Sequence, residues 1–272
     1  MTEKVNKGTW YTLGLASASG GTPTTAKKWY ECTKSSNWRG ENARDRMMNA
    51  LSTNFDRSKF EEYISWQKNK RGCDYVNLFV TNEGNGEGAG YSIWGTTPFS
   101  RKVPNDTSKM MIDRMRYCVK QGLGVWVWLM ADESDGYNSQ ILSRPNDFSR
   151  DLAAGGFLDP SLVSGVILGL EMNEYCKSDE NVINLRDAVK KNWHGVIGTH
   201  HGSGNLDYAK YGDVIFYQTN TGMDPWFISR LVDTVAKDYK KPVCAFEIER
   251  EPAREKCEII MEHSEAFSVG NW

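Results

Sequence analysis

The chain has 272 residues and a formal net charge of −2, which is enough chain for one large α/β barrel or two modest domains. Its basic residues are scattered and form no cluster of the kind that binds nucleic acid. No apolar stretch reaches the length of a membrane-spanning helix. The six cysteines are not spaced as metal ligands, which favours buried thiols, although the sequence does not decide whether disulfides form. Neither a metal nor a cofactor is expected.

Predicted strands alternate with predicted helices from one end of the chain to the other. Short apolar runs predict eight strands, at Thr9–Ala16, Asp74–Val80, Gly124–Met130, Val163–Leu170, Gly195–Thr199, Asp213–Asn220, within Lys241–Arg250, and at Ala266–Trp272. Helical spacing and cap signals predict helices within Glu41–Arg71, from Asp106 to about Gln121, at Asn146–Ala154 and Asp179–Lys191, from Asp224-Pro225 to Tyr239, and from about Pro252 to His263.

Two loop segments invite ligand-binding interpretations that their details do not favour. The glycines of Asn82–Gly90 are not followed by a lysine–serine pair or directly by a helix, so a flexible loop presenting Trp94 is preferred to a phosphate loop. The acidic tip Asp132–Asp135 lacks the full pattern of a calcium-binding EF-hand. Neither segment is therefore assigned a ligand.

The alternation of strands and helices predicts the fold class. Eight apolar strands interleaved with helices, without a proline-rich linker, are the pattern of an α/β fold of the (β/α)8 TIM-barrel type, as a single domain over residues 1–272. The main rival is a doubly wound open sheet, which would carry a glycine fingerprint after its first strand. Polar residues end strands two to seven instead, which suits a ring of loops around one barrel mouth.

Two of the predicted strands end in acidic residues. The fourth strand delivers Glu171, Asn173 and Glu174, and the seventh ends at Glu247, with Glu249 next on the same face. Enzymes of this architecture keep their active sites at the carboxyl ends of the strands. The two strand ends are therefore expected to face each other across a pocket, as glycosidic bond hydrolysis by two carboxyl groups requires.

The motif Glu171-Met172-Asn173-Glu174 after a buried strand resembles the Asn-Glu signature of the retaining (β/α)8 glycoside hydrolase clan that contains the cellulase and mannanase families. The resemblance implies that Glu174 is the general acid/base and that Asn173 contacts the sugar hydroxyl beside the reacting carbon. It also implies that Glu247, five residues after Pro242, is the nucleophile. Glu249 remains the alternative.

Further substrate-binding residues are expected around these glutamates. The resemblance implies that Tyr217 hydrogen-bonds the nucleophile, with Gln218 or Asn220 as register alternatives, and that Trp272 stacks under the sugar. Trp94 or Trp128 is expected to border the pocket beside Trp272, since aromatic planes pack against sugar faces. The pair His200-His201 follows the fifth strand without a third metal ligand at sensible spacing, so one of them, His200, is expected to line the pocket.

The leading functional interpretation is a retaining glycosidase whose partner is a carbohydrate substrate. The alternative is a barrel that binds carbohydrate without catalysis, as a recognition domain of a larger assembly. A lyase or aldolase ranks below both, because no lysine ends a predicted strand. The sequence leaves the sugar, the linkage and the oligomeric state undetermined.

Overall fold

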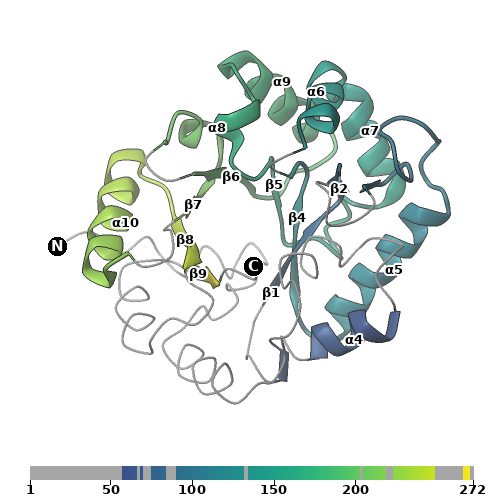
Figure 1. The fold of residues 1–272 in the computed structure, drawn as a ribbon, viewed down its shortest axis with the longest axis horizontal. Helices are drawn as coiled ribbons and strands as arrows, with labels where there is room; N and C mark the ends of the chain where they lie inside the picture. The colour runs from purple at the N-terminus through teal and green to yellow at the C-terminus, as the bar shows by residue number, and fades with distance from the viewer. Residues whose placement is uncertain are drawn as a thin grey trace.

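The computed structural model describes most of the chain beyond Arg57, and Figure 1 draws it as a ribbon. The described residues are 57–65, 68–69, 75–83, 90–131, 134–202, 205–218, 223–248 and 266–269. The predicted strand Thr9–Ala16, the predicted helix from Pro252 and the predicted stacking residue Trp272 lie outside these ranges.

Seven strands form one sheet in which every neighbouring pair is parallel. In spatial order they are β1 (Tyr75–Phe79), β4 (Gly124–Trp128), β5 (Gly165–Ile167), β6 (Ile197–His201), β7 (Val214–Gln218), β8 (Val243–Ile248) and β9 (Ala266–Val269). This order follows the chain without a reversal, whereas a doubly wound sheet reverses its strand order at one point. The preference for the barrel is therefore confirmed.

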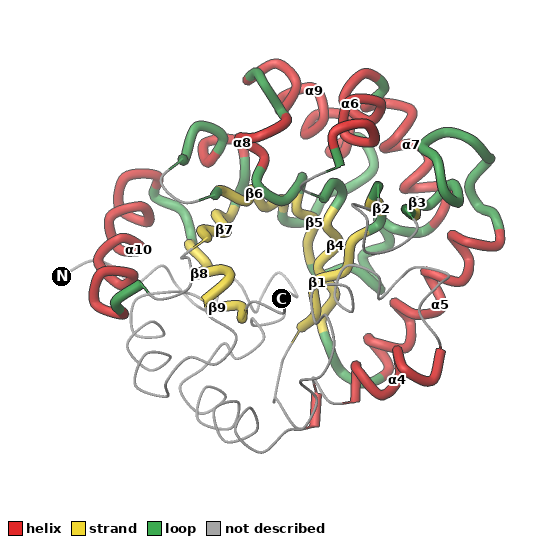
Figure 2. Tube along the Cα trace, in the orientation of Figure 1, coloured by secondary structure: helices red, strands yellow, loops and turns green. Residues whose placement is uncertain are grey.

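The helices lie outside the sheet and follow it in an arc, as Figures 1 and 2 show. They are α4 (Arg57–Ser65), α5 (Asp106–Lys120), α6 (Asp135–Ser143), α7 (Pro145–Gly155), α8 (Met172–Tyr175), α9 (Asp179–Lys190), the 3-10 turn η2 (Ala209–Tyr211) and α10 (Pro225–Tyr239). A two-stranded hairpin, β2 (Thr81–Asn82) and β3 (Tyr91–Ser92), follows β1. Strands inside and helices outside make this a (β/α)8-barrel fold.

Helix starts follow the cap chemistry of the sequence, with one shift. Asp224 caps α10 as predicted, and its Oδ1 accepts hydrogen bonds from two backbone amides of the first turn. The cap of α5 is Asn105 rather than the predicted Asp106–Ser108 segment, because Asn105 and Ser108 form a reciprocal capping box.

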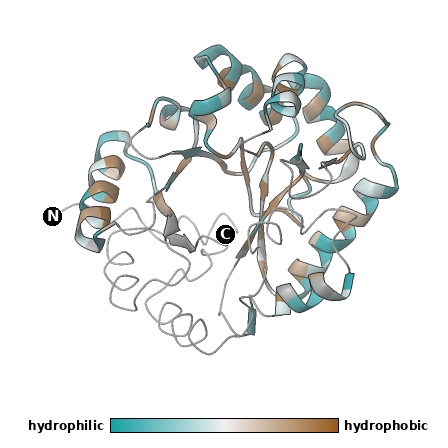
Figure 3. Cartoon of the chain, in the orientation of Figure 1, coloured by the Kyte–Doolittle hydropathy of each residue, from teal (hydrophilic) through white to brown (hydrophobic). Residues whose placement is uncertain are grey.

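The core has two layers, one on each face of the sheet. Side chains alternate between these faces along a strand, so Val125 and Val127 pack outward under the helices while Trp126 and Trp128 point inward. Figure 3 shows apolar colouring along β4 and β5, whereas the helices carry both colours. The inner layer consists of buried, mostly bulky side chains: Phe79, Trp126, Trp128, Ile167, Phe216 and Phe246.

Two glycines on neighbouring strands make room for this inner layer. A Cβ atom on Gly165 would lie 2.2 Å from the ring of Trp126, and one on Gly198 would lie 2.9 Å from the ring of Phe216. Both distances are shorter than carbon atoms tolerate, so any larger residue would displace a ring. The inner layer is therefore packed by aromatic rings lying against bare backbone.

Three of the six cysteines fall in the described ranges, and all three are buried thiols outside any disulfide, as the sequence favours. Burial raises the pKa of the Cys176 thiol to about 12, so this side chain stays protonated. None of the described helices combines the length and the apolar character needed to cross a bilayer.

Candidate active site

The carboxyl ends of β5, β6 and β7 bring polar side chains together at one edge of the sheet. Asn173 belongs to α8, directly after β5, and its Oδ1 accepts a hydrogen bond of 3.3 Å from the backbone amide of Gly202, just after β6. A Cβ atom on Gly202 would lie 3.4 Å from Asn173 Oδ1 and 3.5 Å from Gln218 Oε1, at the end of β7. Three successive strand ends thus converge on Gly202.

The turn between β5 and α8 is held in a strained conformation at Glu171. Its backbone is left-handed, with φ 43° and ψ 49°, a region that costs a non-glycine residue roughly 1–2 kcal/mol. Its amide donates a 2.9 Å hydrogen bond to Nδ1 of His200 on the neighbouring strand. Backbone strain that the surroundings enforce is concentrated at functional sites.

His200 is a neutral, fully buried side chain inside the barrel. Since Nδ1 accepts the Glu171 amide, the ring carries its proton on Nε2, which has no hydrogen-bond partner within the described ranges. Burial lowers the pKa of His200 well below its ordinary value, and neighbouring His201 lowers it further. The ring packs edge-on against Trp128 at 5.4 Å and Phe246 at 4.9 Å, measured between centroids.

His201 lies on the opposite face of β6, because side chains alternate along a strand. It is also buried, its Nε2 lies 2.9 Å from Thr199 Oγ1, and burial lowers its pKa to about 3. Across the described residues, no three His, Cys, Asp or Glu side chains gather as metal ligands would.

The two predicted catalytic glutamates occupy the carboxyl edge of the sheet. Glu174 is an exposed residue of α8, and its backbone amide donates a 2.9 Å hydrogen bond to the carbonyl of Glu171. Glu247 is the fifth residue of β8, and its backbone is described. Because β5 and β8 are parallel members of one sheet, the two positions lie at the same edge.

Among the predicted binding residues, Trp128 lies with His200 in the inner layer. Its ring is fully buried, and Nε1 donates a 2.9 Å hydrogen bond to Oδ1 of Asn77 on β1. Trp128 also contacts Phe79 and Phe246. This ring is therefore part of the buried inner layer below the strand ends and is not exposed at the surface.

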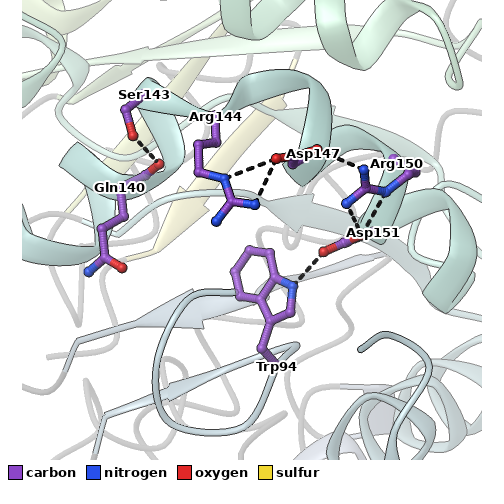
Figure 4. Close-up of polar contacts among 7 residues, drawn as sticks. All are labelled: Trp94, Gln140, Ser143, Arg144, Asp147, Arg150 and Asp151. Atoms are coloured by element: carbon purple, nitrogen blue, oxygen red, sulfur yellow. Dashed lines mark hydrogen bonds and ion pairs between the residues drawn. The ribbon is translucent and has the colours of Figure 1, made fainter. Parts of the chain in front are cut away.

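Trp94 is placed differently from the expectation that it borders the pocket. Its side chain is fully buried in the outer layer, between Phe99 at 4.4 Å and Phe148 at 5.5 Å between ring centroids. Figure 4 shows its Nε1 directed at Asp151 of α7, with a hydrogen bond of 2.7 Å. The ring has no face open to a sugar, because the protein itself covers it.

Tyr217 and its register alternative Gln218 are neighbouring residues of β7. Tyr217 packs in the outer layer with Ile228 and Val232 of α10. Gln218, the register alternative, lies beside Gly202 and Asn173. Successive side chains on a strand point to opposite faces, so the two residues serve different faces of β7 and the role of Tyr217 stays a prediction.

Sequence reasoning missed two parts of this cluster. Gly202 carries no chemical group that a motif could identify, and its role as the meeting point of three strand ends follows only from the fold. The strain at Glu171 also has no signal in the sequence, since left-handed positions are usually recognised by glycine.

No protein-family model matches this sequence, and no curated protein matches it either. Solved structures do resemble the fold. A GH113 β-1,4-mannanase matches with a TM-score of 0.55 and 12% identity, over 83% of this chain and 84% of that one. A glycoside hydrolase of family 5 from Bacteroides vulgatus matches with a TM-score of 0.60 and 14% identity, over 83% of this chain and 56% of that one.

The GH113 β-mannanase AaManA from Alicyclobacillus acidocaldarius, whose structure contains the ligand ManMIm, matches with a TM-score of 0.54 and 11% identity. That match spans 96% of this chain and 88% of the other. At these identities the likeness concerns the path of the chain rather than individual side chains. This protein therefore has the (β/α)8-barrel fold that glycoside hydrolases of families 5 and 113 also have.

Proposed function

We propose that this chain is a glycoside hydrolase that cleaves a polysaccharide or oligosaccharide with retention of configuration. The observation that carries the proposal is the strand-end arrangement: exposed Glu174 follows Asn173, whose amide is held at the end of β6, and Glu247 is the last but one residue of β8, at the same edge. Strand carboxyl ends are where barrel enzymes place their catalytic groups.

The proposed mechanism assigns one role to each glutamate. The Glu247 carboxylate attacks the anomeric carbon, while the Glu174 carboxylic acid donates its proton to the leaving oxygen as the glycosidic bond breaks. Glu174, now a carboxylate, takes a proton from water, which attacks the anomeric carbon and releases Glu247. Two inversions at one carbon leave the configuration unchanged.

The surrounding residues fit these roles. Because Asn173 Oδ1 accepts the Gly202 amide, the Asn173 NH2 group is left to donate to a sugar hydroxyl. His200 is held neutral by burial, so it adds no positive charge that would discourage Glu174 from holding its proton. Gln218 supplies a further amide at the same strand ends.

For the substrate, we infer a β-linked mannan as the first candidate. The support is indirect and comes from the names of the similar structures, which include two β-mannanases and an enzyme in complex with mannotriose. Loops at the carboxyl ends of the strands set the sugar and linkage in barrel enzymes, so related glycans belong in the same screen.

The test is hydrolysis of a panel of mannan, glucomannan, xylan and β-glucan by wild-type protein and by Glu174→Gln and Glu247→Gln. Glu180→Gln, an exposed carboxylate on α9, is the matched control. We expect the Glu174 variant to lose about 10²- to 10⁴-fold in kcat, the usual contribution of general acid–base catalysis. Glu247→Gln should be inactive, and the control should match the wild type.

A wild type that binds but hydrolyses none of these glycans would contradict catalysis and favour a carbohydrate-binding barrel. If both glutamine variants hydrolysed a substrate at the wild-type rate, the assignment of the two carboxyl groups would be wrong.

A further inference from the structure

Two aromatic side chains are exposed side by side in the first turn of α10. Trp226 is 56% exposed and Phe227 is 49% exposed, whereas the other exposed large hydrophobic residue among those described, Val119, reaches only 36%. We call Trp226 and Phe227 the rim pair. Large apolar side chains left in water at adjacent positions often mark a binding surface.

The rim pair lies at the same end of the barrel as Glu174. Helix α10 ends at Tyr239, four residues before β8 begins at Val243, so its last turn is at the amino edge of the sheet. Lys241 just beyond it reaches the carbonyls of Ala209 and Lys210, which precede β7. The first turn is therefore at the carboxyl edge, where β7 ends.

The rim pair is fixed in place by its helix. Asp224 Oδ1 accepts the backbone amides of Trp226 at 2.9 Å and Phe227 at 3.1 Å. Ile228, the next residue, and Val232, one turn beyond it, are buried against the sheet, so the helix cannot roll freely. Cα–Cβ bonds tilt toward the start of a helix, which directs both side chains toward the carboxyl edge.

The size and chemistry of the rim pair favour a carbohydrate occupant over a protein. A stable protein interface takes roughly 20–30 residues from each side, and within the described ranges the exposed large apolar residues around this turn are two. A pyranose ring matches a single indole face, and its hydroxyl groups remain hydrated around the rim.

We propose that the rim pair binds sugar units of a polysaccharide at a distance from the bond that is cleaved, which makes long polymers the substrate class of this enzyme. The proposal rests on the glycosidase function proposed above. β5 and β7 are separated by one strand, about 10 Å between them, and α10 lies outside β7. A chain of several sugars is therefore needed to reach from Glu174 to the rim pair.

The test compares wild type with Trp226→Ala and with the double variant Trp226→Ala/Phe227→Ala. Arg230→Ala, an exposed position on the same helix, is the matched control. Activity is measured on soluble glucomannan and on a short aryl glycoside. Binding is measured separately, by retardation in native gels containing glucomannan, galactomannan, xylan or β-glucan.

We expect Trp226→Ala to lower kcat/KM on the polymer about tenfold, as the loss of one aromatic stacking contact does, and to leave the aryl glycoside unaffected. Gel retardation should weaken in parallel, and Arg230→Ala should behave as wild type. Retardation that depends on Trp226 without any hydrolysis would support polysaccharide binding by the rim pair and refute the proposed catalytic function.

Three results would overturn the proposal. In the first, the double variant hydrolyses and binds the polymer as the wild type does. This result would refute the binding role of the rim pair and leave the proposed glycosidase function standing. In the second, Trp226→Ala dissociates an oligomer in sedimentation without changing polymer binding, so the pair is a protein contact. In the third, the wild type neither binds nor cleaves any of the four polysaccharides. This result would refute both the proposed glycosidase function and the binding role of the rim pair.

Discussion

The buried histidine pair at the end of β6 predicts that mild acid destabilises the protein. His200 and His201 both have pKa values far below the ordinary value of about 6.5, because burial disfavours their charged forms. The unfolded chain therefore binds more protons than the native state below pH 6.5. The free energy of unfolding must then fall as the pH is lowered through this value.

The size of this effect follows from the pKa shifts. With a native pKa of about 3, His201 contributes a loss of about 1.9 kcal/mol between pH 7 and pH 5. Burial lowers the pKa of His200 in the same direction, so His200 adds to this loss. The loss from His201 alone is already a sizeable part of the roughly 5–15 kcal/mol that stabilises a typical domain.

The pH window separates the histidines from the acidic side chains. Three aspartates have lowered pKa values, so the stability that they contribute is present above pH 4 and is lost only as the pH falls below about 3.8: Asp147, Asp159 and Asp179. Among the described residues, the lowered pKa values that matter between pH 7 and pH 5 are therefore those of the histidine pair.

The assay is denaturant unfolding of wild type, His200→Gln and His201→Gln at pH 7 and pH 5, with exposed His194→Gln as the control. Each buried substitution should reduce the pH dependence, whatever its effect on stability at pH 7. A wild-type stability that changes by less than about 1 kcal/mol over this window would refute the reasoning. So would a pH dependence that survives both substitutions.

One further prediction concerns Trp94, and a second compares Gln218 with Tyr217. Trp94→Ala should lower the free energy of unfolding by about 3–5 kcal/mol, as the loss of a buried tryptophan does, while kcat per folded molecule stays unchanged. Equilibrium unfolding and active-site titration check this, and a sugar-binding role would instead raise KM with little loss of stability. Gln218→Ala should lower kcat/KM on a glycan substrate, whereas Tyr217→Phe should change it by less than about twofold. The reverse order of these two effects would make Tyr217 the site-facing residue.

The barrel could be predicted from the sequence because each strand is a short apolar run bounded by polar residues. Each of the seven predicted strand ranges that reach into the described residues overlaps a strand of the sheet. Helix α6 was missed because its sequence, Asp135–Ser143, has only a weak apolar face and begins in an acidic segment. The hairpin β2–β3 was missed because its strands have two residues each, too few to show an alternation.

The candidate site was predictable where it depends on strand ends and not where it depends on side-chain direction. Asn173 and His200 lie at the edge expected of them, because a parallel sheet gathers its carboxyl ends. The choice between Tyr217 and Gln218 stays open, because a one-residue difference reverses the face of a strand. Trp94 was misassigned because its partner Asp151 is 57 residues away, a contact that only the folded chain creates.

The identity of the nucleophile is the most direct test of the account. The measurement is mass spectrometry of the protein after reaction with a 2-deoxy-2-fluoro glycoside, built on the sugar that the hydrolysis screen identifies and carrying a dinitrophenolate leaving group. The electron-withdrawing fluorine slows release of the glycosyl-enzyme, so the ester accumulates. The account predicts one label per molecule, on Glu247. A label on Glu249 or another residue, or hydrolysis without any covalent intermediate, would contradict it.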